Sequence, residues 1–468
     1  MSGDVTCDVA VVGAGDSGRR CALYCAEAGL DVCLIDENSH GTPDRRAWLR
    51  LDQSGTPDAA ALRRAGGRTL FSHTVWTALA MDELPTGGEG FWLSAMHAGR
   101  DTAIKARAVV DATGMGVRVV PFEGWTLPGV FDFDDAFGFG EALPDGPIVV
   151  AGAGLAIYAA AAHLVRAGAP LTAVIDLESD GVWRARRGAL RAVPDALRMA
   201  IRWLRTIRGA GVEVVPGARV RAARGEGALE AVVVESVDAE ARALGEPERS
   251  IAAGSLLVSH GFMPGGNLAA LLGASRRYDE RFGAPILNVD ERGRTSVDGL
   301  FAVGGAARGH SVDAGDAALC AAAVAADFGV SVDEATVEAA MRDRDCHAPA
   351  VAALRDAERL RTPLISVIPA TTTICAYEGV TRADVDAAVD QGAGDVSQLK
   401  HFTRLGMGPC RGRQCGEIAA HLMAQKLGKP RSAMGLLTPR PPLRAVTLGD
   451  LVGEFSYADI PIPAPAPL

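Results

Sequence analysis

Short apolar runs alternate with alanine-rich helical patterns along most of the chain, and glycine turns join the two. The first run, residues 8–12, ends in the turn Gly13-Ala14-Gly15-Asp16-Ser17-Gly18, and a helical pattern follows from Arg19 to Ala28. A second run, Val32 to Ile35, ends in Asp36. This order of strand, glycine turn, helix, strand and acid predicts a dinucleotide-binding βαβ unit. In such a unit the helix N-terminus binds phosphates and the acid accepts hydrogen bonds from a ribose.

Two later strands also end in small residues, as a nucleotide site in a split domain requires. The run from Ala106 to Asp111 ends in Ala112-Thr113-Gly114, a motif common where a flavin-binding domain returns to its core sheet. The run from Gly299 ends in Gly304-Gly305, ahead of an alanine-rich helical pattern. We therefore expect FAD to contact residues at these turns: Gly13, Gly15, Asp16, Ser17, Gly18, Asp36, Glu37, Ala112, Thr113, Gly114, Gly304 and Gly305.

A second unit of the same kind follows. The apolar run 148–150 leads into the turn Gly152-Ala153-Gly154, a helical pattern comes next, and the following strand ends in Asp176. Ile157 stands where the third glycine of the motif belongs, and a β-branched residue there pushes helix and strand apart. Two interpretations stay open, a nicotinamide-dinucleotide site and a structural copy that binds nothing; we expect no tight binding of NAD(P).

The predicted fold class is α/β. It is a flavoprotein with two dinucleotide-binding domains, in which an NAD(P)-like domain is inserted into the FAD domain, and it carries a small helical C-terminal domain of the cluster-binding type. The expected boundaries are 1–145 and 266–335 for the FAD domain, 146–265 for the NAD(P)-like domain, 336–370 for a helical linker, 371–430 for the C-terminal domain and 431–468 for a proline-rich tail.

Length and charge exclude several classes of protein. The chain has 468 residues, of which 48% are apolar, enough for about two to four globular domains. Its net charge of −10 argues against non-specific nucleic-acid binding, so we expect no nucleic-acid partner. No apolar run approaches the roughly 20 residues that span a membrane, and no secretory signal pattern is present at the start. We therefore expect a cytoplasmic protein with no membrane span.

Two further patterns have a plain structural interpretation and a functional one. The stretch 183–208 carries eight Arg against one acid, Asp195, and is either a solvated helix face or a docking surface for an acidic partner. Cys21 and Cys25 lie one turn apart on the first helix and are expected to be small buried hydrophobic residues. No C-x-x-C pair occurs, so a disulfide-reductase mechanism lacks its dithiol.

Several segments together resemble one family over nearly the whole chain. The most specific are Pro121 to Val130, the loop Gly406 to Gly416 and the tail motif Arg440-Pro441-Pro442-Leu443. The chain resembles the α-type FAD subunits of heteromeric amino-acid, opine, hydroxyproline and proline dehydrogenases. That family includes the middle subunit of hydrogen cyanide synthase and is related to the α subunit of sarcosine oxidase. The C-terminal domain resembles bacterioferritin-associated ferredoxin, which holds a 2Fe–2S cluster on four cysteines.

The resemblance implies an electron-transfer subunit that does not oxidise the substrate itself. A partner flavoprotein similar to D-amino-acid oxidase would oxidise the amine or amino acid, and a small 2Fe–2S subunit is a further partner in such complexes. Three departures affect the expected FAD site. Gly305 replaces a common Asp, Arg19 and Arg20 replace small or aliphatic residues, and residues 38–43 replace a Pro-Gly-Gly-Gln-like turn.

The resemblance also implies a metal site at Cys375, Cys410 and Cys415, with Tyr377 at the position of the remaining cluster cysteine. A 2Fe–2S cluster needs four ligands, usually thiolates, and a phenolate is an uncommon one. The alternatives are a cluster with an unusual fourth ligand, for which Cys346, His347 and His401 are candidates, and a module without a cluster. For the whole chain, the alternatives are a self-sufficient NAD(P)H-dependent flavin oxidoreductase and a scaffold subunit with degenerate cofactor sites.

Overall fold

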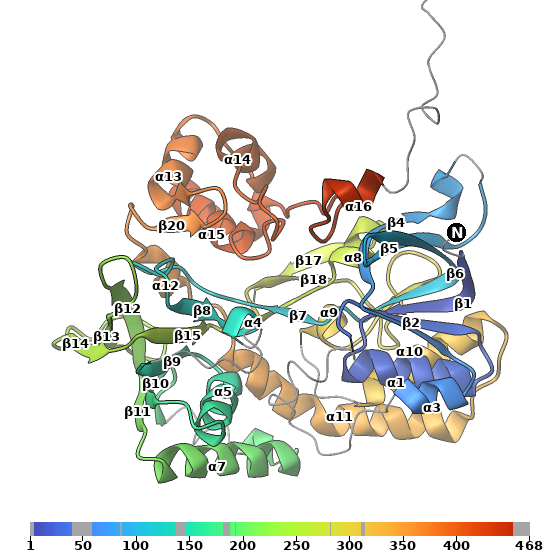
Figure 1. Ribbon diagram of the computed structural model, residues 1–468, viewed down its shortest axis with the longest axis horizontal. Helices are drawn as coiled ribbons and strands as arrows, with labels where there is room; N and C mark the ends of the chain where they lie inside the picture. Colours follow the sequence, from blue (N-terminus) through green and yellow to red (C-terminus); the bar gives the residue numbers. More distant parts are fainter. Residues whose placement is uncertain are drawn as a thin grey trace, which may run out of the picture.

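The computed structural model describes residues 4–39, 59–84, 87–136, 146–180, 188–191, 193–280, 282–309 and 314–452. Two α/β units lie side by side, and a helical C-terminal unit lies above the second and reaches the first through the segment that ends in α16 (Leu448–Val452) (Figure 1). The long helix α11 (Glu334–Ala357) runs beneath the first unit toward the second (Figure 1). Within these ranges, no helix combines the length and the apolar character needed to cross a membrane.

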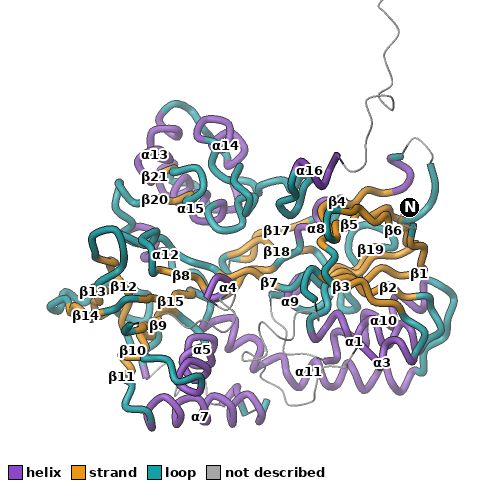
Figure 2. Tube along the Cα trace, viewed as in Figure 1, coloured by secondary structure: helices purple, strands orange, loops and turns teal. Residues whose placement is uncertain are grey.

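The first unit is built on a mixed sheet with a fully buried centre. The middle strand β1 (Val5–Val12) pairs in parallel with β2 (Val32–Asp36) and β6 (Arg100–Asp111). Its residues Val9, Ala10 and Val11 are inaccessible to solvent, as in a strand covered on both faces. Helices α1 (Asp16–Glu27), α3 (Ala59–Arg64) and α10 (Ala314–Asp327) lie together on one side of this sheet (Figure 2). The strand order is β3 (Arg68–Phe71), β2 (Val32–Asp36), β1 (Val5–Val12), β6 (Arg100–Asp111), β5 (Phe91–His97) and β4 (Thr74–Ala80), with β19 (Leu300–Ala302) beside the end of β6.

The sequence pattern suggests one strand from Leu70 to Leu79, and this prediction is wrong. The structure has two strands there, β3 beside β2 and β4 beside β5. Ser72 has a φ of +57° and turns the chain between them. The amides of Ser72 and His73 donate to the carbonyl oxygens of Asn38 and Asp36 at 3.0 and 2.9 Å, so the end of β2 holds the turn in place.

The second unit is a five-stranded parallel sheet. Helices α5 (Leu155–Arg166) and α7 (Pro194–Gly209) lie on one side of it, and α7 begins where Pro194 suits a first helical position. Residues 183–187 and 192 of the predicted basic stretch, and the side chain of Asp195, lie outside the described residues. The order is β11 (Glu213–Pro216), β10 (Leu171–Asp176), β9 (Ile148–Gly152), β15 (Ser255–Ser259) and β8 (Val130–Asp132), with an antiparallel layer of β12 (Ala218–Arg224), β13 (Ala231–Ser236) and β14 (Arg249–Ala252).

Two short strand pairs lie outside the main sheets of the α/β units. In one, β7 (Met115–Val117) pairs with β16 (Phe262–Pro264), so the chain crosses between the units twice at the same place. In the other, β17 (Arg276–Asp279) pairs with β18 (Ala284–Leu287) and approaches the C-terminal unit. Short helices complete this region: α4 (Phe133–Ala136), α8 (Asn267–Leu271) and α9 (Gly305–Arg308).

The C-terminal unit packs its helices around a small apolar core. The sequence predicts Thr381 as a helix N-cap with Asp384 at the third helical position, and this cap is present. Thr381 Oγ1 accepts a hydrogen bond from the Asp384 amide at 3.2 Å, and the Asp384 carboxylate accepts one from the Thr381 amide at 2.8 Å. The elements are α12 (Thr362–Ser366), β20 (Thr373–Cys375), β21 (Val380–Thr381), α13 (Arg382–Asp390), α14 (Val396–Thr403), α15 (Gly416–Leu427) and a 3₁₀ turn at Arg431–Met434.

The tail lies against the first unit as far as it is described. The Leu443 amide donates to Trp76 O on β4 at 2.7 Å, and Arg444 pairs with Glu37 at 3.0 Å. These contacts place the segment after the 3₁₀ turn beside the end of β2. The last part of the predicted proline-rich tail, residues 453–468, lies outside the described residues.

Buried charged groups mark the junction of the two α/β units with the end of α11. Arg118 is buried and donates from Nη1 to Glu358 O at 3.0 Å and from Nη2 to Gly283 O at 3.1 Å. Burial raises the pKa of Glu358 to about 7, although Arg118 opposes the shift. Burial lowers the pKa of His260 to about 3, and its Nδ1 accepts a hydrogen bond from the Val120 amide at 3.1 Å. The junction therefore favours the neutral form of both side chains.

The Glu358→Gln variant should reveal this effect as a pH dependence of stability. Because the folded-state pKa lies above the value of about 4.3 for an unperturbed glutamate, the stability that Glu358 contributes is complete below that value and is lost as pH rises through about 7. The thermal midpoint of the wild-type chain should therefore fall relative to the variant between about pH 5 and about pH 8. Arg118 and His260 are present in both proteins, so their contributions to the pH dependence of the thermal midpoint cancel in the comparison. A difference that stays constant in calorimetry across this range would contradict the assignment.

Candidate functional site

A cavity of about 780 Å³ extends from the first glycine turn to the C-terminal unit. One wall comes from the ends of β1, β2 and β6 and from the loop before α8. The opposite wall comes from the C-terminal unit, including Tyr377, Cys410 and the segment 436–445. Sites for cofactors and small ligands usually have about 300–1,000 Å³, so the cavity has the size of a dinucleotide site.

The first turn can adopt its shape only with glycine at two positions. Gly13 has a φ of +109°, and a Cβ there would collide with the carbonyl oxygen of Ala112. A Cβ on Gly18 would collide with the carbonyl oxygen of Gly13, so α1 could not pack against the turn. Gly15 is different, because a Cβ there would meet no protein atom within 4 Å, and Gly15 lines the cavity. The N-terminus of α1 is therefore open to a phosphate.

Asp36 fastens this turn to the end of β2. Its Oδ2 accepts a hydrogen bond from the Ala14 amide at 2.6 Å, and its Oδ1 accepts two from Asn38, at 2.8 and 2.9 Å. The sequence suggests Asp36 as an acceptor for a ribose. The structure places it at the cavity, but these hydrogen bonds also give it the task of shaping the turn. The neighbouring Glu37 pairs with Arg444 from the tail.

The buried carboxylate of Asp111 shapes the turn Ala112-Thr113-Gly114. Its Oδ1 accepts hydrogen bonds from the Thr113 amide at 3.1 Å and the Thr113 hydroxyl at 2.6 Å. Its Oδ2 accepts one from the Ala269 amide of α8 at 3.0 Å, and burial raises the pKa of Asp111. The end of β6 is thus tied to α8, whose first residues line the cavity, by a bond between residues 158 positions apart.

The predicted cofactor residues fall into two groups. The residues of the first group line the cavity itself: Gly13, Gly15, Asp36, Glu37, Ala112, Thr113 and Gly114. The residues of the second group support the cavity from behind: Asp16 pairs with Arg20 at 3.0 Å, and Gly304 leaves no room for a Cβ because Ser17 lies against it.

The packing around Gly305 explains why the chain lacks the aspartate that is common at this position in the family it resembles. A Cβ at Gly305 would lie 2.5 Å from Met115 Cγ and 3.1 Å from the carbonyl carbon of Gly114. The Met115 side chain, which lines the cavity, thus occupies the space of a larger residue at 305. Arg19 also has a local role, since its Nε donates to Ala14 O at 2.8 Å and its guanidinium lies 5.6 Å from the Phe71 ring centre. This Arg therefore supports the turn.

The sequence interpretation missed the wall that the C-terminal unit and the tail provide. Arg413 and Arg440 line this wall, and Arg276 of β17 lines the cavity beside it. None of the three has an ion-pair partner among the described residues, and Arg276 Nη2 donates to Leu437 O at 2.8 Å. His73 lines the opposite end and stacks on His97 with a ring separation of 4.5 Å. The only feature of the sequence that pointed to this wall was the motif Arg440 to Leu443, and the sequence did not predict where this motif lies in the fold.

The three cysteines of the C-terminal unit come together. The Cys375 thiol forms a hydrogen bond with that of Cys415, and the amides of Gly406, Tyr377 and Glu378 donate to its sulfur, which lowers its pKa to about 6. Burial raises the pKa of Cys410, and the nearby Cys375 sulfur raises that of Cys415.

These residues do not provide the four thiolates that a 2Fe–2S cluster requires. In the described part of the chain, no group of three or more His, Cys, Asp or Glu side chains is arranged to hold a metal ion. The Tyr377 side chain packs against Gly408 and is 56% exposed. The other candidates lie elsewhere: His347 pairs with Asp343 on α11 beside the exposed Cys346, and His401 contacts Phe402. We assign no electron-transfer step to a cluster.

In the second unit the glycine turn is present, but the acid that ends the next strand, Asp176, already accepts a hydrogen bond from another side chain. The Tyr158 hydroxyl donates to Asp176 Oδ2 at 2.5 Å, and Asp176 is fully buried. Gly152 has a φ of +138° and packs against Ser259, and Ile157 is buried in the core of the unit. The strand-turn-helix geometry is therefore retained, while the group that would bind a ribose belongs to the core.

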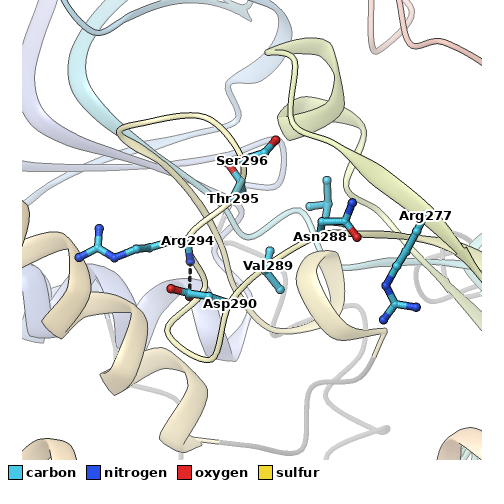
Figure 3. A pocket seen from close by; sticks show the side chains of 8 residues that line it. Arg277, Asn288, Val289, Asp290, Arg294, Thr295 and Ser296 are labelled. Atoms are coloured by element: carbon cyan, nitrogen blue, oxygen red, sulfur yellow. Dashed lines mark hydrogen bonds between the residues drawn. The ribbon is translucent and has the colours of Figure 1, made fainter.

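A second hollow of about 540 Å³ lies on the first unit at the turn after β18 (Figure 3). Its Asp290 carboxylate accepts hydrogen bonds from the amides of Arg292 and Arg294, at 2.8 and 2.9 Å. The Arg294 guanidinium pairs with Asp327 of α10. Asp290 and Arg294 are thus both used to hold the turn.

Comparisons with known proteins agree with this architecture. A family model described as pyridine nucleotide-disulphide oxidoreductase matches residues 7–326, and one described as sarcosine oxidase A3 domain matches residues 371–454. An opine oxidase subunit from Agrobacterium tumefaciens (strain Ach5) is 29% identical over 469 residues, which is 95% of this chain and 91% of that protein. Hydrogen cyanide synthase subunit HcnB of Pseudomonas aeruginosa is 28% identical, over 92% of this chain and 96% of that protein.

Solved structures share the fold. L-proline dehydrogenase from P. horikoshii matches with a TM-score of 0.64 and 21% identity, over 96% of this chain and 80% of that one. Thioredoxin reductase from T. acidophilum matches with a TM-score of 0.51 and 19% identity, over 69% of this chain and 99% of that one. The predicted fold class, with two dinucleotide-binding domains and a helical C-terminal region, is confirmed, as is the predicted resemblance to this group of oxidase and synthase subunits.

Replacing Tyr377 by Cys should increase iron binding, because it would supply a thiol at the position where the family that the chain resembles has a cluster cysteine. We expect iron and sulfide assays to show less than a full 2Fe–2S complement in the wild-type chain and more in Tyr377→Cys after anaerobic reconstitution. Tyr377→Phe is the matched control and should stay low. Stoichiometric iron in the wild-type chain that Tyr377→Phe leaves unchanged would show that another residue completes the site.

Proposed function

The chain belongs to the pyridine nucleotide-disulphide oxidoreductase family, and from this premise we propose that it is the FAD-binding, electron-transfer subunit of a heteromeric amine or amino-acid oxidase or dehydrogenase. The observation that carries the proposal is the shared cavity. It begins at the open N-terminus of α1 and ends at the cysteine loop of the C-terminal unit. A cofactor bound at the glycine turn would therefore face the C-terminal unit rather than bulk solvent.

The residues around the cavity fit FAD. The amides at the N-terminus of α1, next to Gly15, would bind the pyrophosphate, and Gly13 and Gly18 hold them in place. Asp36 lies at the end of β2, where the ribose would bind. Arg444 reaches Glu37 from the tail and would close the cavity at this end. Bound FAD would supply electron transfer through its flavin ring, and the chain would bind it, orient it and shield it from water.

We place substrate oxidation in a partner flavoprotein similar to D-amino-acid oxidase, with a small 2Fe–2S subunit as a further partner. Two observations support a partner. The relatives are named subunits of an oxidase and of a synthase, so those proteins work in assemblies. In addition, Tyr377, Phe402 and Met407 of the C-terminal unit are 56%, 47% and 45% exposed, so this unit presents large apolar side chains that a partner could cover.

Replacing Gly15 by Leu should abolish FAD binding without unfolding the chain. The backbone of Gly15 is in an extended conformation that any residue adopts, and no protein atom lies near its Cβ position. A side chain there would compete only with the cofactor, so we expect at least about tenfold less FAD per chain, since about 1.4 kcal/mol of lost binding already gives this factor. The measurement is chromatography of the heat-released supernatant.

Gly209→Leu is the matched control for this experiment, because a Cβ at Gly209 also meets no protein atom within 4 Å and lies far from the cavity on α7. It should keep the full FAD content. Finding no flavin, or only FMN, in the wild-type chain would refute the proposed cofactor.

The chain purified alone should show negligible amino-acid:dye oxidoreductase activity. Co-expressed with an oxidase-like flavoprotein, it should copurify, and the complex should be active because FAD bound in the cavity would accept electrons from the partner. The measurement is dye reduction by the isolated chain and by the complex at equal flavin concentration. Ordinary turnover by the single chain would refute the subunit assignment and favour a self-sufficient oxidoreductase.

A further inference from the structure

The sequence of the second dinucleotide unit leaves open whether it binds a nicotinamide dinucleotide or binds nothing. Its strand-turn-helix geometry is intact, and the N-cap of α5, Gly154, has no side-chain cap of its own. In such a unit the pyrophosphate of a dinucleotide binds at this helix N-terminus and the rest of the ligand lies along the carboxyl ends of the strands. The described residues around this place show what occupies it.

Glu358 lies on the glycine turn. A Cβ at Gly154 would lie 2.7 Å from Glu358 Cγ and 2.9 Å from Glu358 Oε1. A Cβ at Gly261, in the turn after β15, would lie 2.7 Å from Glu358 Cβ. The side chain is thus wedged between the two turns at the carboxyl ends of β9 and β15. Arg118 holds the Glu358 carbonyl oxygen from the other side.

The next residues continue along the same edge of the sheet. Arg361 forms an ion pair with Glu178, which follows β10, and each side chain is only 1% exposed. Arg361 Nε also donates to Ala239 O at 3.2 Å. Arg359 pairs with Glu240 at 2.6 Å. Since a buried ion pair with one partner removed is strongly destabilising, the Arg361–Glu178 pair fixes this segment to the edge.

Helix α12 then covers what remains of the edge. Ala153 of the glycine turn and Leu177 after β10 belong to the same buried cluster as Leu364, Ile365 and Ile368. That cluster continues into α13 and α15 of the C-terminal unit. Figure 1 shows α12 between the second sheet and these helices. Farther along, Trp125 Nε1 donates to Thr373 O at 2.7 Å.

We propose that the second dinucleotide unit is the socket of the C-terminal unit: residues 358–368 bind where a nicotinamide dinucleotide would bind, and this fixes the C-terminal unit over the first cavity. Each part of an ordinary dinucleotide site has another occupant. Glu358 lies on the glycine turn, Tyr158 uses the acid Asp176, and α12 covers the strand ends. The unit thus binds a segment of its own chain, and reduction by NAD(P)H has no route through it.

Hydrogen–deuterium exchange of the full-length chain tests the socket without requiring flavin or a partner. In the wild type, peptides covering 153–156 and 362–368 should exchange slowly, and millimolar NADH should change neither. In Arg361→Ala, both peptides should exchange at least about tenfold faster, because the segment and the turn protect each other. Peptides from β1 and β2 should be unaffected. Arg249→Ala is the control, since it removes an exposed ion pair with Glu213 in the same unit, and it should leave both peptides protected.

Two results would overturn the proposal. The first is release of 362–368 in Arg361→Ala while 153–156 stays protected, because the segment would then not cover the turn. The second is protection of 153–156 by NADH in the wild type while 358–368 also stays protected, because the dinucleotide site would then be open. If Arg361→Ala does not fold, Glu358→Ala removes the side chain on the turn and should deprotect 153–156; unchanged protection there would equally refute the socket.

Discussion

The close approach of the first glycine turn to the end of β6 is the constraint on which the first cavity depends. Gly18 packs on the carbonyl oxygen of Gly13, and Gly13 packs on that of Ala112, so β1, α1 and β6 meet with no side chain between them. Asp36 and Asp111 then tie this point to the end of β2 and to α8. Buried carboxylates that accept several hydrogen bonds fix a backbone more strictly than apolar contacts do, because each unmade bond has a high energetic cost.

Much of this first unit could be predicted from the sequence, because its signals are local. The glycine spacing, the strand lengths and the alanine-rich helices are each encoded within about 30 residues. The same holds for the cap at Thr381, where Asp384 lies three positions away. The prediction of one strand from Leu70 to Leu79 is wrong because the chain makes a left-handed turn at Ser72. This turn depends on hydrogen bonds to Asn38 and Asp36, which the local sequence pattern does not contain.

The second wall of the cavity could not be predicted for the same physical reason. Arg444 and Glu37 are 407 positions apart, and Arg276 and Leu437 are 161 apart. Contacts of this separation depend on how whole units pack, which residue spacing does not encode. The arrangement of the cysteine region could be predicted only in part. The sequence groups Cys375, Cys410 and Cys415, and the structure brings Cys375 and Cys415 into contact, yet the position of Tyr377 against Gly408 follows only from the fold of the loop.

The two dinucleotide units of this chain show how one geometry serves two purposes. In the first, the helix N-terminus at Gly15 has no protein atom near its Cβ position and lines a cavity. In the second, the equivalent Gly154 lies against Glu358. The motif alone therefore does not decide between a ligand and a segment of the chain. The segment after α11 decides it, because it brings the Glu358 side chain, a buried ion pair and a short apolar helix to the edge of the second sheet. Ile157, which stands in place of the third glycine, is buried in the core of this unit, and the strand-turn-helix geometry is retained there.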